Sequence, residues 1–246
     1  MDLHIDETEL SKLLSDINCD LVFKEETLST NEDLKQMKMA RGPICEVALS
    51  QTSGKGSNGR SFVSTKGSGI YFSILLKDNG YKYVTPKIAT LIYKAFQNLY
   101  GINLGIKWVN DLYYKGKKVC GILCEKNFES DSIIIGIGIN LFKIENDVLK
   151  ENNLENIAGY IFDEGERNKI DFTYLVYEIV KNLYDEINKN KIDEIYKNNN
   201  LVLNKEVLYN SKKYIAKSIN NEGHLIIEDS SGSIEIASKN DIEIVI

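Results

Sequence analysis

Alternation of apolar and polar residues predicts a β-hairpin over residues 107–125. The pattern indicates one strand over 107–114, a Lys-Gly turn at 115–116 and a second strand over 117–125. This segment is therefore expected to form two neighbouring strands of a sheet.

A lysine opens the apolar face of the second of these strands. Because side chains alternate between the two faces of a strand, Lys118 is expected to share its face with Cys120, Ile122 and Cys124. Two interpretations stay open. The lysine extends its ammonium group into solvent from the strand end, or it binds an anion in a site.

The next predicted strand, over 132–141, has two different faces. Its odd-numbered positions are all isoleucine or leucine, so that face is expected in the core. The other face carries Gly136, Gly138 and Asn140. Glycine is unfavourable within a strand unless a bulge forms or another group approaches the backbone closely. Two glycines in phase beside an asparagine favour the floor of a small-molecule site over a bulge or tight sheet packing.

A glycine-rich loop at 54–60 has the spacing of the dinucleotide-binding fingerprint, Gly-x-Gly-x-x-Gly. That fingerprint requires a helix directly after it, and residues 60–69 show no helical period. The dinucleotide-binding interpretation is thereby excluded. Two interpretations remain: a loop whose amides, Lys55 and Arg60 cover a phosphate, or a solvated flexible loop.

Helical periodicity predicts two packing helices, over 86–101 and 171–188. A third helix is expected after Ser29, Thr30 and Asn31, one of which would be its N-cap. Capping is the main alternative to ligand binding for these three residues. The free amides of a helix N-terminus allow both roles together.

Beyond about residue 203 the pattern changes to short strands separated by turns rich in Asn, Ser and Gly. Such spacing predicts a small β-barrel. The polar stretch 189–200 is the expected junction, and His224, beside a turn glycine, is expected on the surface. The expected strands are 206–209, 213–216, 224–228, 233–236 and 242–246.

Composition narrows the class of protein. The chain has 246 residues, 43% of them hydrophobic, enough for one sizeable domain and a small one. Its net charge of −6 gives no electrostatic basis for binding nucleic acid. The four cysteines show no zinc-like pairing with His4 and His224, so no metal site is expected. No apolar run reaches membrane-spanning length and the N-terminus is not signal-like, which predicts a cytoplasmic location.

Several motifs, in a fixed order, give the chain a family resemblance. They are Ser29-Thr30-Asn31, Gly54 to Arg60, Lys107-Trp108-Val109-Asn110-Asp111-Leu112, Lys118 to Glu125 and Gly136 to Asn140. Together they resemble the biotin–protein ligases, also called biotin–[acetyl-CoA-carboxylase] ligases, in the short form without an N-terminal DNA-binding domain. The resemblance runs from about residue 24 to the C-terminus.

The resemblance implies a fold and a reaction. The implied fold is α/β, with a mixed sheet and flanking helices like those of class II aminoacyl-tRNA synthetases over 1–200, and an SH3-like barrel over 201–246. The implied reaction uses ATP and Mg²⁺ to convert biotin to biotinyl-5′-AMP. Biotin is then transferred to a lysine of a biotin carboxyl carrier domain of acetyl-CoA carboxylase or a related carboxylase.

The resemblance also implies roles for individual residues. Lys118, Asp111 and Lys55 are the expected catalytic residues, with Lys118 bridging the biotin carboxylate and the α-phosphate; a turn-forming role is the alternative for Asp111. Trp108 is either an apolar wall of the site or core. The residues expected to bind biotin are Ser29, Thr30, Asn31, Gln51, Lys55, Gly56, Ser57, Lys118, Gly136 and Gly138. Those expected to bind ATP or the adenylate are Arg60, Phe62, Asn110, Lys118 and Asn140.

Three positions depart from the family pattern: Val109 replaces a proline, Ser57 replaces the second arginine of the loop, and Ala216 replaces a glycine. Two rival functions stay open. A lipoate–protein ligase would share the fold and the reaction logic, and a non-catalytic module would bind nucleotide or carrier domain without forming an adenylate. An exposed sheet edge would allow a homodimer.

Overall fold

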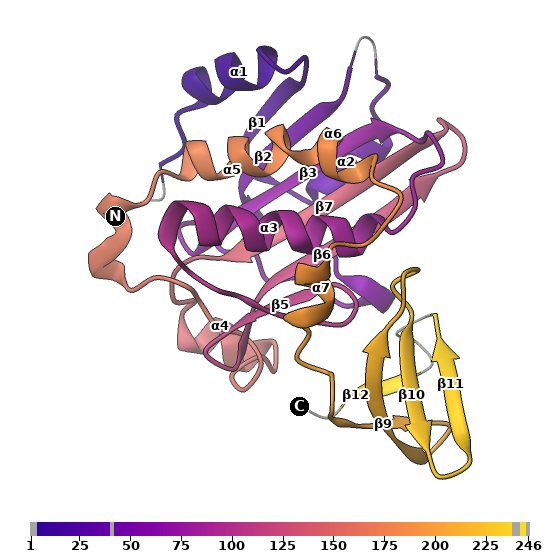
Figure 1. Ribbon diagram of the computed structural model, residues 1–246. Coiled ribbons are helices and arrows are strands. Elements are labelled where there is room, and N and C mark those ends of the chain that lie inside the picture. The colour runs from indigo at the N-terminus through magenta and orange to yellow at the C-terminus, as the bar shows by residue number, and fades with distance from the viewer. Residues whose placement is uncertain (1–3, 40–41, 238–241, 245–246) are drawn as a thin grey trace.

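The computed structural model describes residues 4–39, 42–237 and 242–244, which form a seven-stranded mixed sheet flanked by helices and a smaller C-terminal sheet (Figure 1). The first two strands of the large sheet pair in parallel and the others antiparallel. The predicted α/β class is thus confirmed. The strand order is β1 (Asp20–Thr27), β2 (Ile44–Gln51), β3 (Gly69–Lys77), β7 (Ser132–Asn140), β6 (Lys117–Asn127), β5 (Asp111–Tyr114) and β4 (Gly105–Lys107).

One face of the large sheet carries the main core. The helices on that face are α1 (Glu7–Ser15), α3 (Val84–Tyr100), α5 (Phe172–Lys181) and α6 (Leu183–Ile187). The isoleucine face of β7 is buried in this core, as predicted. The predicted helix over 86–101 is α3, which ends at Gly101 with a φ of 67°.

The prediction of a single helix over 171–188 was wrong, because this stretch forms two helices, α5 and α6, that meet at Asn182. The Asn182 side-chain amide donates to the backbone carbonyl of Glu178 at 2.9 Å. Such side-chain bonds to the preceding turn compete with the regular helix ladder.

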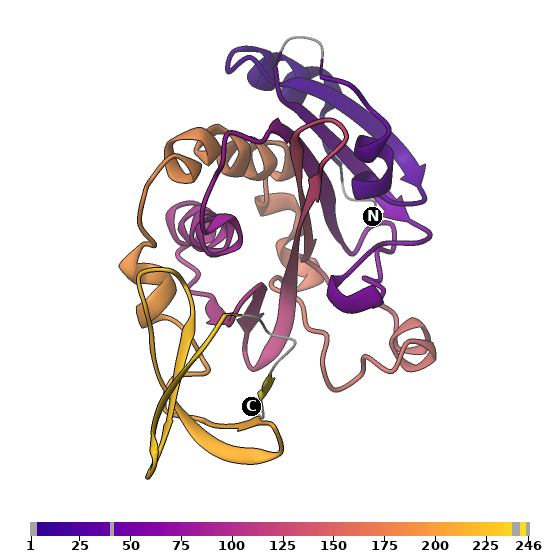
Figure 2. The ribbon, with the colours of Figure 1, turned by 90° about the vertical axis from the view of Figure 1, so that its right-hand side faces the viewer.

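The opposite face of the sheet carries one short helix, α2 (Thr30–Lys35), on the other side from α3 (Figure 2). Leu34 of α2 packs with Ile44, Leu75 and Ile134 in a small second apolar cluster. The glycine-rich loop contains only a three-residue 3₁₀ turn, Ser57–Gly59, and no helix follows it. This face is therefore less covered than the core face.

The C-terminal sheet is antiparallel, and a short helix, α7 (Glu194–Asn198), lies in the predicted junction before it. The buried Trp108 indole donates from Nε1 to the carbonyl of Gly223 at 2.8 Å and so ties this sheet to the large one. The domain boundary and the barrel type stay predictions. The strand order is β11 (Gly232–Ile236), β10 (Leu225–Asp229), β9 (Lys212–Ile219), β8 (Glu206–Tyr209) and β12 (Ile242–Ile244).

Two further short elements complete the fold: α4 (Asn146–Glu151) and a 3₁₀ helix at Glu164–Lys169. None of the helices within the described residues has the length and apolar character needed to cross a membrane.

Replacing Trp108 by phenylalanine should loosen the C-terminal sheet. The variant loses one buried hydrogen bond and part of a fully buried ring, which together should lower the free energy of unfolding by about 2–3 kcal/mol. Hydrogen exchange should rise most in β9 and β10, whereas replacing the partly exposed Tyr174 by phenylalanine should change little. Exchange in β9 and β10 that matches the wild type would contradict this role of Trp108.

Candidate active site

Lys118 lies on the opposite face of β6 from the one that strict alternation predicts. In the pairing of β5 with β6, Leu112 faces Cys120 and Tyr113 faces Lys118, so Val119 is the extra residue of a β-bulge. Val119 and Cys120 are both fully buried in the core. The bulge reverses the phase, and the Lys118 ammonium lies 3.4 Å from where a Cβ atom on Gly121 would stand. The prediction that Lys118 shares a face with Cys120 was therefore wrong.

Lys118 forms an ion pair with Asp111, the first residue of β5. Its Nζ lies 2.7 Å from Asp111 Oδ1, and the two side chains are 26% and 7% exposed. A largely buried carboxylate is stable only when it is paired, so each group holds the other in place. The Lys118 ammonium also lies 5.9 Å from the centre of the Phe62 ring, within range of a cation–π contact.

The glycine face of β7 is closely covered. A Cβ atom on Gly138 would lie 2.5 Å from the Phe62 ring, and one on Gly136 would collide with the side-chain amide of Asn31. Gly138 pairs with Gly121 of β6. A Cβ atom on Gly121 would lie 3.0 Å from the same Phe62 ring. The glycines therefore let the Phe62 and Asn31 side chains approach the strand closely. That this face forms the floor of a small-molecule site stays a prediction.

A hydrogen-bond network holds the start of α2 to the sheet. The Thr30 and Ser73 hydroxyl groups are 2.6 Å apart, and Ser73 also bonds to Asn31 Oδ1 at 2.6 Å. The Thr30 backbone amide donates to Gln51 Oε1 at 2.9 Å. Ser29 occupies the N-cap position, but its side chain makes no capping hydrogen bond. The capping alternative is thus not the explanation for the Ser29 side chain.

Two adjoining cavities meet at Lys118. The smaller, of about 40 Å³, is lined by all ten residues predicted to bind biotin, together with Asn110 and Phe62. The larger, of about 460 Å³, is lined by Asp111 and by four of the five residues predicted to bind nucleotide. Those four are Arg60, Phe62, Lys118 and Asn140. The structure therefore brings the predicted residues together, with Lys118 and Phe62 lining both cavities.

Two asparagines near the cavities differ in their bonding. The Asn110 amide donates to the carbonyl of Ile122 at 2.9 Å and so fixes the turn before β5. Asn140 is 5% exposed and lines the larger cavity, and its Oδ1 accepts no hydrogen bond from any of the described residues. A buried oxygen without a donor is unfavourable, so Asn140 is suited to accept a bond from a ligand.

The glycine-rich loop folds back on itself. Arg60 donates to the Ser57 hydroxyl at 2.9 Å and to the Ser57 carbonyl at 3.1 Å. Asn58 and Gly59 have φ angles of 60° and 71°, and the left-handed region favours glycine. The loop therefore presents one guanidinium group, held by Ser57, to the larger cavity.

Trp108 lines neither cavity, is fully buried, and belongs to the core. The peptide bond between Trp108 and Val109 is cis.

A segment around residues 154–159 walls part of the larger cavity, and no motif in the sequence predicted it there. The Lys118 amide donates to the carbonyl of Ile157, and the Gly159 amide donates to the carbonyl of Lys118, both at 2.8 Å. No periodic pattern marks this segment as a neighbour of β6, so its place depends on the fold. The apolar lining residues that were not predicted are Val63, Ile144, Leu154, Ile157, Ala158 and Ile242.

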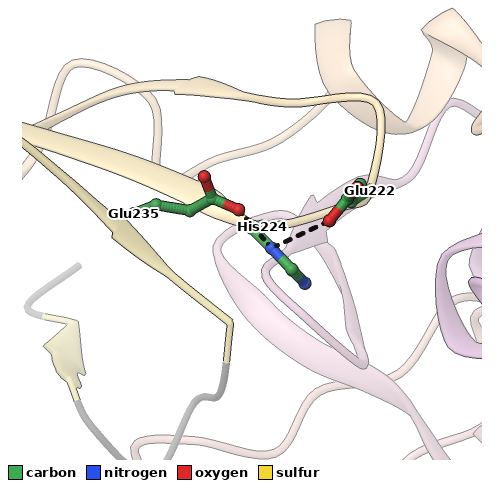
Figure 3. A group of neighbouring side chains, drawn as sticks. All are labelled: Glu222, His224 and Glu235. Atoms are coloured by element: carbon green, nitrogen blue, oxygen red, sulfur yellow. Dashed lines mark hydrogen bonds and ion pairs between the residues drawn. The ribbon is translucent and has the colours of Figure 1, made fainter.

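Glu222, His224 and Glu235, whose side chains are of types that can bind metal ions, lie together at the C-terminal sheet (Figure 3). His224 Nδ1 is 2.5 Å from Glu235 Oε1 and 3.7 Å from Glu222 Oε2. Asn220 donates to the same Glu235 oxygen at 3.0 Å. These contacts fix the turn that also carries Gly223, and they give His224 a hydrogen-bonding role that the sequence did not predict. Within the described part of the chain, this is the one group of three such residues close enough to share an ion.

Residues 23–140, which contain the motifs just described, match the model of the Biotin/lipoate A/B protein ligase family. The matched segment is slightly less than half of the chain. Within this segment, the match confirms the resemblance seen in the sequence.

Similar proteins carry related names. A "Bifunctional ligase/repressor BirA" of Bacillus subtilis is 31% identical over 169 residues, which are 65% of this chain and 51% of that protein. A "Biotin--[acetyl-CoA-carboxylase] ligase" of Paracoccus denitrificans is 30% identical over 125 residues, 47% of this chain and 52% of that protein. The chain thus spans about half the length of these curated relatives.

The fold also matches solved structures of this ligase family. A biotin protein ligase from Aquifex aeolicus in complex with biotin and ATP is 26% identical, with a TM-score of 0.72. The match covers 92% of this chain and 98% of that one. A biotin acetyl coenzyme A carboxylase synthetase from Helicobacter pylori shares the fold at 16% identity and a TM-score of 0.57.

Replacing Gly138 by valine should displace the Phe62 ring, because the first added carbon already lies 2.5 Å from it. The fold should persist, since the opposite face of β7 keeps its core packing, but the biotin binding that the resemblance implies should be lost in calorimetry. The matched control is Gly165→Val, because a Cβ atom at Gly165 would meet no other atom within 4 Å. Biotin affinity equal to the wild type would show that this face does not line the site.

Proposed function

We propose that the chain is an ATP-dependent ligase that forms biotinyl-5′-AMP and then transfers biotin to a lysine of a carrier domain. The observation that carries the proposal is the position of Lys118 at the meeting point of the two cavities. The match to the family model, the names of the relatives and the biotin and ATP bound in the Aquifex aeolicus structure point to biotin and ATP as substrates.

In the first step, an oxygen of the biotin carboxylate attacks the α-phosphorus of ATP, and the bond to pyrophosphate breaks. Two anions must come together, and charge grows on the phosphoryl oxygens in the transition state. A fixed cation at that point lowers the barrier because it needs no reorganisation. Lys118, held by Asp111 at 2.7 Å, is the cation that we assign to this role.

The two cavities divide the substrates between them. Biotin binds at the smaller cavity, which at about 40 Å³ must widen to admit it as the Phe62 ring moves off the glycine face. There Ser29, Thr30 and Gln51 contact its polar end and Lys55 supports its carboxylate. The nucleotide occupies the larger cavity, where Asn140 offers a buried acceptor oxygen and Arg60 offers a guanidinium group. Phe62 separates the two as an apolar wall.

Mg²⁺ enters with the nucleotide in this proposal. Asp111 is the acidic residue among those lining the larger cavity, and it is already paired with Lys118. This donor set fits a metal ion held mainly by phosphate oxygens, which is the usual arrangement for Mg²⁺ with nucleotides. The ion would add positive charge near the phosphates.

In the second step, the amine nitrogen of the acceptor lysine attacks the acyl carbon and AMP leaves. An unperturbed lysine has a pKa of about 10.4, so its neutral form at pH 7 costs on the order of 4–5 kcal/mol. We assign Asp111 to attract the acceptor ammonium and take its proton. The acceptor is a biotin carboxyl carrier domain of a carboxylase, as the name of the Paracoccus relative indicates for that protein.

The test is an assay of ATP–pyrophosphate exchange with biotin or lipoate, followed by mass spectrometry of a carrier domain. Exchange driven by biotin and a carrier heavier by one biotin would support the proposal. Exchange driven by lipoate alone would favour the other branch of the family. Tight binding without exchange would indicate a non-catalytic module.

Replacing Lys118 by alanine should slow adenylate formation much more than it weakens biotin binding, because the charge contact is made mainly in the transition state. We expect a loss of about two to three decades in the exchange rate, in line with the removal of one such stabilising group. Lys117→Ala is the matched control and should change little, because the Lys117 ammonium donates to the backbone carbonyl of Glu155 instead. Turnover near wild type in the Lys118→Ala variant would remove this lysine from the mechanism.

Replacing Ser57 by arginine should slow the release of biotinyl-adenylate. The added guanidinium restores a charge-assisted contact of about 1.5–3 kcal/mol, which corresponds to about one to two decades in dissociation rate. Ser57→Ala is the control, since it removes the hydroxyl that holds Arg60 without adding charge. If stopped-flow release from Ser57→Arg is as fast as from the wild type, other groups of the loop retain the intermediate.

A further inference from the structure

The helix that carries three of the proposed biotin residues has little apolar anchorage. It is six residues long, with Ser29 as its N-cap and Thr30 and Asn31 in its first turn. Leu34 is the one apolar residue among those that α2 buries. Packing alone therefore explains little of how this helix is held on the sheet.

Ion pairs hold both flanks of α2. On one flank, Lys24 of β1 bonds to Asp33 Oδ2 at 2.7 Å, and the Thr27 hydroxyl donates to the same oxygen. On the other flank, Lys35 bonds to Glu125 of β6 at 2.9 Å. The flank at Lys24 contains one further charged group, and that group is fully buried.

That group is Glu46, in the middle of β2 and 0% exposed. It pairs across the sheet with Ser73, the residue whose hydroxyl bonds to Thr30 and Asn31. The Lys24 ammonium lies 3.2 Å from Glu46 Oε1. Neither carboxylate oxygen of Glu46 has a well-aligned hydrogen-bond donor among the described residues.

The network has one cation for two carboxyl groups. Among the described residues, the titratable groups that face Glu46 are Lys24 from β1 and Asp33 from α2, while β3 contributes the uncharged Ser73. Lys35 of α2 is directed to Glu32 and Glu125 instead. With both carboxyl groups ionised, the buried network carries an uncompensated negative charge. A proton between the carboxyl groups removes that charge and supplies the missing hydrogen bond.

The titration behaviour agrees with this geometry. Burial, together with the hydrogen bond and charge of Asp33, raises the pKa of Glu46 to about 7, with Lys24 opposing the shift. Burial alone would also raise the pKa of Asp33, but its hydrogen bonds with Lys24 and Thr27 lower it. The proton therefore resides on Glu46 and leaves near neutral pH.

We propose that Lys24, Glu46 and Asp33 position α2 for biotin binding through one shared proton, and that biotin binds more weakly when this proton is lost. This inference rests on the proposed function, because it assumes that biotin contacts Thr30 and Asn31. The three residues touch no substrate in this view. They are positioning residues that act through the helix.

The direction of the effect follows from the raised pKa. The contribution of Glu46 to stability is complete at acidic pH and is lost as pH rises through about 7, because ionisation leaves a fully buried carboxylate and the partly buried Asp33 carboxylate facing one lysine. The helix should then loosen at its Asp33 flank. The larger cavity has no lining residue on α2, so nucleotide binding should not follow the same pH dependence.

Calorimetry of biotin binding between pH 6 and 8.5 tests the inference. Wild-type affinity should fall by about tenfold across this range, consistent with the linkage of one proton. Glu46→Gln should keep the affinity of the acidic form at every pH, because its amide donates to Asp33 and does not titrate. Glu25→Gln is the control and should follow the wild type, because Glu25 is highly exposed on the neighbouring strand β1 and its side chain pairs with Lys66.

A second pair of variants separates positioning from general stability. Lys24→Met should raise the KM for biotin and leave the KM for ATP unchanged, and Lys24→Arg should restore most of the biotin affinity because it keeps the charge. Equal changes in both KM values would overturn the positioning role.

The outcomes also separate this inference from the proposed function. A wild-type affinity that is constant from pH 6 to 8.5, or one that falls identically in Glu46→Gln, overturns the inference alone. Absence of biotin binding by the wild type at every pH overturns the proposed function and this inference with it.

Discussion

The ion pair between Lys118 and Asp111 is the interaction on which the arrangement of the site depends. A mostly buried lysine at the meeting point of two cavities would be unfavourable without a partner, and Asp111 supplies the opposite charge at 2.7 Å. The β-bulge at Val119 makes the pair possible, because it turns Lys118 away from the core while its neighbours stay buried. Positive charge is therefore in place before any substrate arrives.

The two faces of β7 explain why the site forms on one side of the sheet. The isoleucine face packs under the main core with α3, which leaves no room there for a ligand. The glycine face lets Phe62 and Asn31 approach the backbone, and these two residues connect the loop and α2 to the strands beneath them. One strand thus contributes both to the stability of the core and to the shape of the cavities.

Electrostatic contacts have a larger share in holding the site than in holding the rest of the fold. The core helices are placed by apolar burial, whereas α2 is short and is flanked by ion pairs to β1 and β6. Apolar packing does not depend on pH. A network of two carboxyl groups and one lysine does, because its groups gain and lose protons. The contacts that hold α2 on the sheet therefore include groups that titrate, whereas those that hold the core helices are mainly apolar.

Much of this architecture could be predicted from the sequence. The hairpin around residues 115–116, the helix ending at Gly101 and the isoleucine face of β7 depend on periodicity and turn chemistry, which are local properties. The residues that the resemblance implies for biotin binding also line one cavity.

Other features were decided only by the tertiary structure. Strict alternation put Lys118 on the wrong face, since a bulge is defined by the register with a partner strand. The sequence left Trp108 as either wall or core, and its burial against the turn at Gly223, 115 residues away, makes it core. The segment around Ile157 and the buried Glu46 carry no local signal for their neighbours. Period and turn chemistry determine which elements form, whereas register, burial and charge pairing arise only when residues distant in sequence come into contact.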